Sequence, residues 1–153
     1  MKIKKIISIF TLLLAFSLLT FNSSCSNERN ETVSCFPNSA ISVQLNLSLP
    51  SYYQLQNVGG WVYVSDVGSG TRGLIVVRVV SGFKIYDRNA PHICPDTNTT
   101  LEVKNDTTIY CPNDGSEWIL ITGQPANNSV AKIAPKTYAY SYDSNSNILS
   151  VYN

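Results

Sequence analysis

Two short stretches of the sequence carry side chains that can bind a metal. The stretch YDRNAPHICPD holds His92 and Cys94, and the stretch TIYCPNDGSEWILITG holds Cys111 and Asp114. Imidazole, thiolate and carboxylate groups are all ligands of iron and zinc, and one His, one Asp and two Cys are chemically conceivable for either metal. These four residues are therefore the candidate ligands of a metal site.

Other catalytic patterns are absent from the sequence. It contains one histidine, so a Ser-His-Asp triad would have to use His92, and it has no GxSxG motif. The glycine-rich stretch GSGTRG lacks the lysine and the following helix of a phosphate-binding loop, which favours a hairpin turn. The sequence thus favours a protein with no catalysis of its own.

The elements that would position the four candidates are β-strands. Val43, Leu45, Leu47 and Leu49 alternate with polar residues, as on a strand with one buried face. The run LIVVRVV is continuously apolar, which predicts a strand buried on both faces. No helical stretch of credible length follows the N-terminal region. We therefore expect an all-β fold of small antiparallel sheets, like a barrel or a sandwich, with further strands in GGWVYVSD, GFKIYDR, TTLEV, TTIYC and EWILITG.

The C-terminal stretch TYAYSYDSNSNILSVYN predicts a hairpin. Tyr138, Tyr140 and Tyr142 share one face of its first strand, and a polar turn at 143–147 precedes Leu149 and Val151. Tyrosines in such a row could stack on sugars or bases. A half-buried strand face is the preferred interpretation, because no basic residues are interleaved.

The N-terminus has the layout of a secretory signal, with three lysines in the first five residues and an apolar run from Ile6 to Leu19. Small residues then precede Cys25, and a polar stretch follows it, which resembles a bacterial lipoprotein signal. We expect a signal peptide at 1–24, a polar linker at 25–38 after a lipidated Cys25, and one β domain at 39–153. Ordinary cleavage nearby, with Cys25 left as a thiol, is the alternative.

Charge and length limit the possible partners. Removal of Lys2, Lys4 and Lys5 leaves eight basic against ten acidic residues, a net charge near −2. This balance gives no electrostatic reason to expect nucleic-acid binding. The expected partner is the membrane, through the lipid on Cys25, in a bacterial cell envelope; no protein partner can be named from the sequence.

The segment from Phe83 to Tyr138 resembles a Rieske-type iron–sulfur domain, with the cluster-loop region at about 83–124. That family carries Cys-x-His in one loop and Cys-Pro-x-His-Gly-Ser in a second. Here the first loop reads Ala90-Pro91-His92, and the second reads CPNDGS from Cys111. The resemblance implies a Rieske-like fold in which the two loops face each other.

The departures from the family's motif concern the ligands of its [2Fe–2S] cluster. In that cluster two thiolates hold one iron and two imidazoles hold the other. Ala90 stands where a cysteine is expected and Asp114 where a histidine is expected, so each iron loses one ligand. We therefore expect no cofactor, and a structural or binding module in the cell envelope. The alternative is electron transfer through an atypically ligated 2Fe–2S cluster or a single metal ion at the four candidates.

The cysteines after Cys25 are Cys35, Cys94 and Cys111, and in an oxidising compartment one pair and one odd thiol is the simplest account. Some members of the Rieske family carry a disulfide between the two loops, so the resemblance favours a bond between Cys94 and Cys111. Cys35 is then a free or buried thiol, or it replaces one member of that pair.

Overall fold

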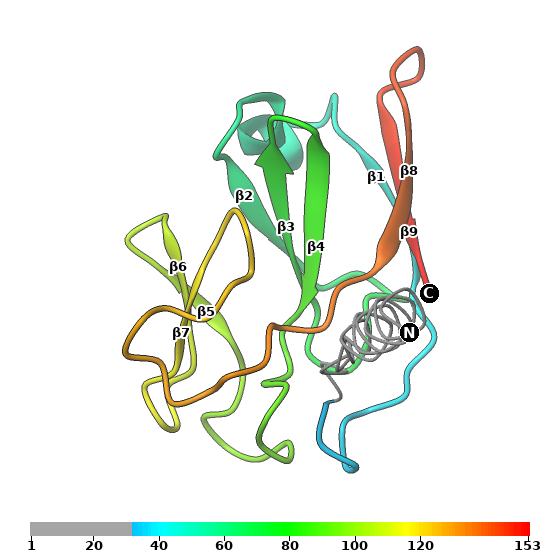
Figure 1. The fold of residues 1–153 in the computed structure, drawn as a ribbon. Helices are drawn as coiled ribbons and strands as arrows, with labels where there is room; N and C mark the ends of the chain where they lie inside the picture. The colour runs from blue at the N-terminus through cyan, green and yellow to red at the C-terminus, as the bar shows by residue number, and fades with distance from the viewer. Residues whose placement is uncertain (1–31) are drawn as a thin grey trace, which may run out of the picture.

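The computed structural model describes residues 32–153, and in this part of the chain nine strands form three antiparallel sheets. The strands are β1 (Ser42–Asn46), β2 (Trp61–Val64), β3 (Leu74–Val79), β4 (Gly82–Asp87), β5 (Glu102–Lys104), β6 (Thr108–Tyr110), β7 (Glu117–Ile119), β8 (Ala139–Asp143) and β9 (Ile148–Tyr152). In Figure 1 the β2–β3–β4 sheet lies between the β1–β9–β8 sheet and the β5–β6–β7 sheet. The expected all-β fold of small antiparallel sheets is confirmed.

The N-terminal predictions concern residues that are not described. The signal peptide and the lipidation of Cys25 lie outside residues 32–153. Within that range no helix combines the length and the apolar character needed to cross a bilayer.

The first sheet joins the two ends of the described chain. Leu45 of β1 lies opposite Leu149 of β9, and both are fully buried. The neighbouring residues Gln44 and Asn46 are exposed, which confirms the expected alternation up to Leu47, whereas Leu49 is 49% exposed and its predicted place on the buried face was wrong. The predicted C-terminal hairpin is also present, as β8 paired with β9.

Strand β3 has both faces buried, as predicted from its continuous apolar run. Leu74 and Val76 belong to a cluster that includes Leu45 and Leu149. Ile75 and Val77 face a second cluster, which includes Trp118, Ala90 and Cys111. Because successive side chains of a strand point to opposite faces, β3 packs against both cores and separates them.

One element was not expected from the sequence. A short 3-10 helix, η2 (Pro50–Gln56), follows β1, with Pro50 at its start and Leu55 buried in the first cluster. A proline is tolerated in the first turn of a helix because its missing N–H has no partner there.

The burial of the three tyrosines decreases along the chain, from Tyr138 just before β8, through the half-buried Tyr140, to Tyr142, which is 37% exposed. Tyr138 is 8% exposed and its hydroxyl donates to Asp87 at 2.5 Å. The hydroxyl of Tyr140 accepts a hydrogen bond from the amide of Phe83, and the Tyr142 hydroxyl donates to Asn147. The face is therefore a packed, partly buried strand face, as the preferred interpretation stated.

Candidate functional site

The first of the two loops follows β4 and crosses the second core. The amide of Ala90 donates to the carbonyl of Thr99, and Ala90 itself is 1% exposed. Beyond it, the side chain of His92 is 16% exposed. The ring of His92 packs edge to face on Trp118, with 5.6 Å between the ring centroids. The loop therefore presents His92 at the edge of the core.

The second loop connects β6 to β7 through a tight turn. The amide of Cys111 donates to the Ser116 carbonyl, and the amide of Gly115 donates back to the Cys111 carbonyl. Gly115 has a φ of 74°, which favours glycine. The carboxylate of Asp114 accepts from the Ser116 amide at 3.0 Å, so Asp114 also stabilises the turn.

The two loops meet at one polar contact. Nε2 of His92 lies 2.7 Å from Oδ2 of Asp114. The hydroxyl of Ser116 donates to the same carboxylate oxygen at 2.7 Å and lies 3.2 Å from Nε2 of His92. It also accepts a hydrogen bond from the amide of Ala131. Ser116 belongs to the CPNDGS stretch, but its role as the junction of three segments depends on tertiary contacts that the sequence does not contain.

The electrostatics of this contact follow from the hydrogen bonds around Asp114. Burial alone would raise the pKa of Asp114, but hydrogen bonds from the Ser116 side chain, His92, the Ser116 amide and the Cys111 thiol outweigh it and lower that pKa to about 2. Burial raises the pKa of Cys111, and the neighbouring carboxylate of Asp114 raises it further, against two backbone hydrogen bonds that lower it. Asp114 is therefore ionised and Cys111 is a neutral thiol at pH 7.

The disulfide prediction was wrong. Cys94 is bonded to Cys35, with 5.5 Å between their Cα atoms, and Cys111 is a buried free cysteine. Cys94 lies on the surface, whereas Cys111 is 0% exposed inside the second core, so the two side chains occupy different environments. A hydrogen bond from the amide of Val33 to the carbonyl of Pro91 holds the N-terminal segment beside the first loop. Cys35 therefore replaces Cys111 in the pair.

Ser116, His92 and Asp114 are the residue types of a hydrolase triad, but their geometry differs from one. In a triad the acid binds one ring nitrogen and the serine binds the other. Here Asp114 and Ser116 both approach Nε2, and Nδ1 of His92 is buried with no hydrogen-bond partner among the described residues. Ser116 is also fully buried. The trio therefore lacks the arrangement needed to activate a nucleophile.

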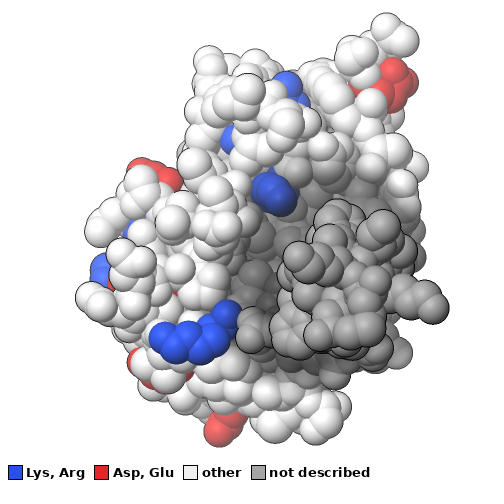
Figure 2. All heavy atoms as spheres, viewed as in Figure 1, with Lys and Arg blue, Asp and Glu red and all other residues white. Residues whose placement is uncertain are grey.

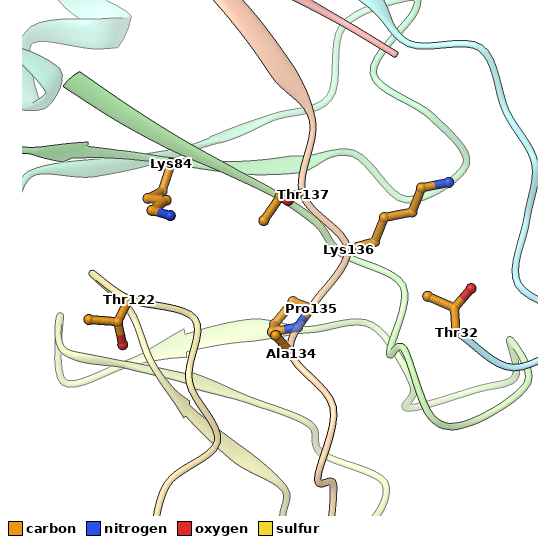
Figure 3. A pocket seen from close by; sticks show the side chains of 7 residues that line it. All are labelled: Thr32, Lys84, Thr122, Ala134, Pro135, Lys136 and Thr137. Atoms are coloured by element: carbon orange, nitrogen blue, oxygen red, sulfur yellow. The ribbon is translucent and has the colours of Figure 1, made fainter. Parts of the chain in front are cut away.

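A separate cleft of about 670 Å³ lies between β4 and the chain that leads to β8. Figure 3 shows Lys84 and Thr122 at one side of it, while the side chain of Lys136 extends away from Lys84. The ammonium group of Lys136 lies over the rings of Phe36 and Tyr138, at 5.2 Å and 5.4 Å. The two lysines therefore do not converge on a common ligand.

Comparison with known proteins gives two distant structural neighbours. No protein-family profile and no curated protein matches the chain. One neighbour is a chain of the complex of reduced oxygenase and oxidized ferredoxin in carbazole 1,9a-dioxygenase, with 20% identity, a TM-score of 0.43, and coverage of 73% of this chain and 93% of the other. The second is the ferredoxin of carbazole 1,9a-dioxygenase from Nocardioides aromaticivorans IC177, with 16% identity, a TM-score of 0.42, and coverage of 74% and 96%. Similarity at this level assigns no activity or ligand to this chain.

The residues at the two loops do not fit a [2Fe–2S] cluster of the Rieske type. Two thiolates and two imidazoles are required, and the loops offer one free thiol at Cys111 and one imidazole at His92. The buried methyl group of Ala90 supplies no donor, and the sulfur of Cys94 is bonded to Cys35. Of the four candidate ligands, the structure thus brings His92 and Asp114 into contact, with Cys111 beside Asp114, and leaves Cys94 apart. In residues 32–153 no three His, Cys, Asp or Glu side chains are grouped to hold a metal ion.

Proposed function

We propose that this protein is an exported, lipid-anchored module of a bacterial cell envelope, whose Rieske-like domain has lost its cluster and has a structural or binding role. The observation that carries the proposal is the 2.7 Å contact between His92 and Asp114. It lies between the two loops that, by resemblance, would hold the cluster, and it joins them directly.

The ligating atoms at this point are already used within the protein. Nε2 of His92 pairs with Asp114, and the same carboxylate accepts from Ser116 and from the thiol of Cys111. A metal would have to displace these hydrogen bonds, and a hydrogen bond to a charged group contributes about 1.5–3 kcal/mol. The loops are therefore closed by polar side chains in place of a metal.

The surface charge gives no support to nucleic acid as a partner of this module. Figure 2 shows Lys, Arg, Asp and Glu side chains scattered on one face, with no continuous basic area. The mature chain is slightly acidic, as its composition indicates. Phosphate backbones are bound by clustered basic residues.

The alternative is electron transfer through a retained cluster or a single metal ion. Two pairwise contacts favour it, because the carboxylate of Asp114 contacts His92 and also accepts from the thiol of Cys111. It would need a fourth protein donor, and Cys94 becomes available only when its bond to Cys35 is broken.

Metal analysis of the full chain, expressed with its own signal and purified anaerobically, decides between the two. We expect a colourless protein with no stoichiometric iron, zinc or acid-labile sulfide. Two irons with two sulfides, and a paramagnetic spectrum after reduction, would establish the alternative. The double variant A90C/D114H, which restores the two missing donor types, serves as the control that the cells load clusters into this fold.

The anchor is tested separately by cell fractionation. The wild-type chain should be found with the membranes and incorporate labelled fatty acid. The Cys25→Ala variant should lose the label and leave the membrane fraction. An unlabelled wild-type chain, or a variant that remains with the membranes, would contradict the lipid anchor.

A further inference from the structure

A groove of about 320 Å³ lies where η2, the turn before β2 and the turn between β5 and β6 come together. Its lining includes Tyr53, Gln54, Asn57, Gly59, Trp61 and Asp106. In Figure 1, η2 and the β5–β6 turn lie in the upper half of the molecule, while the chain that follows β4 runs through the lower half. The groove is therefore separate from the site at His92 and Asp114.

The aromatic ring of Trp61, which lines this groove, is held in place. Nε1 of Trp61 donates to Oδ1 of Asp106 at 2.9 Å. The ring packs edge to face on Tyr63, with 4.9 Å between centroids, and contacts the second core. A binding site whose aromatic side chain is already fixed loses less entropy when a ligand is bound.

Asp106 occupies a position where glycine is the common choice. Asn105 and Asp106 have φ values of 54° and 56°, as the two central residues of a tight hairpin turn between β5 and β6. Aspartate tolerates this conformation, and unlike glycine it provides the carboxylate that fixes Trp61. The turn thereby positions the ring.

Three polar side chains of the groove make no hydrogen bond within the described part of the chain. Among the hydrogen bonds within residues 32–153, none uses the side-chain amide of Gln54 or Asn57, or the hydroxyl of Tyr53. Tyr53 is 63% exposed, so its ring is accessible to a ligand in the groove. Gly59, with open space around its missing Cβ, leaves that part of the lining without a side chain.

This combination indicates the chemistry of a ligand. The lining has no cationic residue, which disfavours an anion, and its one acid is engaged by Trp61. Amide side chains both donate and accept, as neighbouring hydroxyl groups require. Aromatic faces cover apolar C–H surfaces, and about 320 Å³ is in the lower part of the range for small-molecule pockets. We infer that this groove binds a neutral sugar ring, with Trp61 and Tyr53 against its C–H face and Gln54 and Asn57 on its hydroxyls.

The test is ligand-observed saturation-transfer NMR on the full chain with neutral monosaccharides and short neutral oligosaccharides at millimolar concentration. We expect a subset of them to bind. Tighter binding of the oligosaccharides would indicate a glycan chain as the source, and tighter binding of the monosaccharides would indicate a free sugar. Failure of every neutral sugar to bind, or preferential binding of a quaternary ammonium compound or an anion, would overturn the inference.

Two exposed tyrosines provide matched variants. Tyr53→Ala should weaken sugar binding about tenfold or more, as truncation of an aromatic contact does, with unchanged thermal stability. Tyr152→Ala, at the exposed end of β9, should bind as the wild type does. Gln54→Ala, at a second exposed position of the groove, should also weaken sugar binding, because it removes the amide proposed to bind the hydroxyls. Equal affinity of Tyr53→Ala and the wild type would overturn the proposed role of the groove, whatever the metal content of the protein.

Discussion

The two cores of this molecule share strand β3 and differ in what closes them. The first core is covered by β1 and β9, whose Leu45 and Leu149 meet across a continuous ladder of strand pairs. The second core is covered in part by loops, and there Ala90 and Cys111 are buried although they lie outside regular strands. Alternating strand residues, together with Leu55 of η2, close the first. Beside the second, a disulfide ties the first loop to the N-terminal segment and a polar contact joins the two loops, so specific pairs of residues contribute more to its stability.

The largest effect should come from the disulfide. Cys35 and Cys94 are 59 residues apart, and the chain-entropy model gives about 4 kcal/mol for a loop of that length. The C35S/C94S double variant should lose about this much free energy of unfolding in chemical denaturation. Cys111→Ser is the control, and non-reducing peptide mapping should show its disulfide intact. A peptide that joins Cys94 to Cys111 in the wild type would contradict this pairing.

The two cores can be compared directly with one substitution in each. Leu149 and Leu120 are both fully buried, one in each cluster. Leu149→Ala should lower the free energy of unfolding by about 3 kcal/mol, and Leu120→Ala by about 2 kcal/mol, because loops relax around a cavity more easily than a strand ladder does. A larger loss at Leu120 would show that the loop-covered core is the more rigid of the two.

A smaller loss of stability is expected when the hydrogen bond from Tyr138 to the buried carboxylate of Asp87 is removed. Asp87 is 3% exposed and accepts from the hydroxyl of Tyr138. Tyr138→Phe leaves this acid with one donor fewer, which should cost about 2 kcal/mol of unfolding free energy. Tyr152→Phe, at an exposed position, should change little. Equal stability of the two variants would show that Asp87 does not depend on this donor.

The smallest effect concerns the contact between the loops and should depend on pH. The folded pKa of Asp114 is about 2, below its ordinary value of 3.8, so its contribution to stability is present above pH 4 and is lost as the pH falls toward 2. Asp114→Asn should remove this part of the acid dependence and lower stability at pH 7 by about 1 kcal/mol. Acid denaturation curves of the two proteins measure the difference. Identical curves would mean that the contact between His92 and Asp114 does not contribute to the stability of the protein.

The strand periodicity and the types of side chain in the two loops could be predicted from the sequence. The contacts between residues far apart in the chain could not. Alternation at Val43 to Leu49 and the apolar run in β3 follow from local side-chain periodicity, which correctly predicted most strands and the buried faces. Leu49, at 49% exposed, marks where that periodicity no longer applies, since η2 begins directly after it. The resemblance to the Rieske family predicts a cysteine at Ala90 and a histidine at Asp114, and the sequence has neither.

What the sequence alone determined is therefore the fold class, most strand faces and the types of side chain that the two loops carry, because each depends on residue type and local order along the chain. The tertiary structure decided that Cys94 bonds Cys35, that His92 meets Asp114, and that Asp106 fixes Trp61. Each of these contacts joins segments at least 22 residues apart. Their proximity depends on how the sheets pack, and the local order of residues along the chain does not specify that packing.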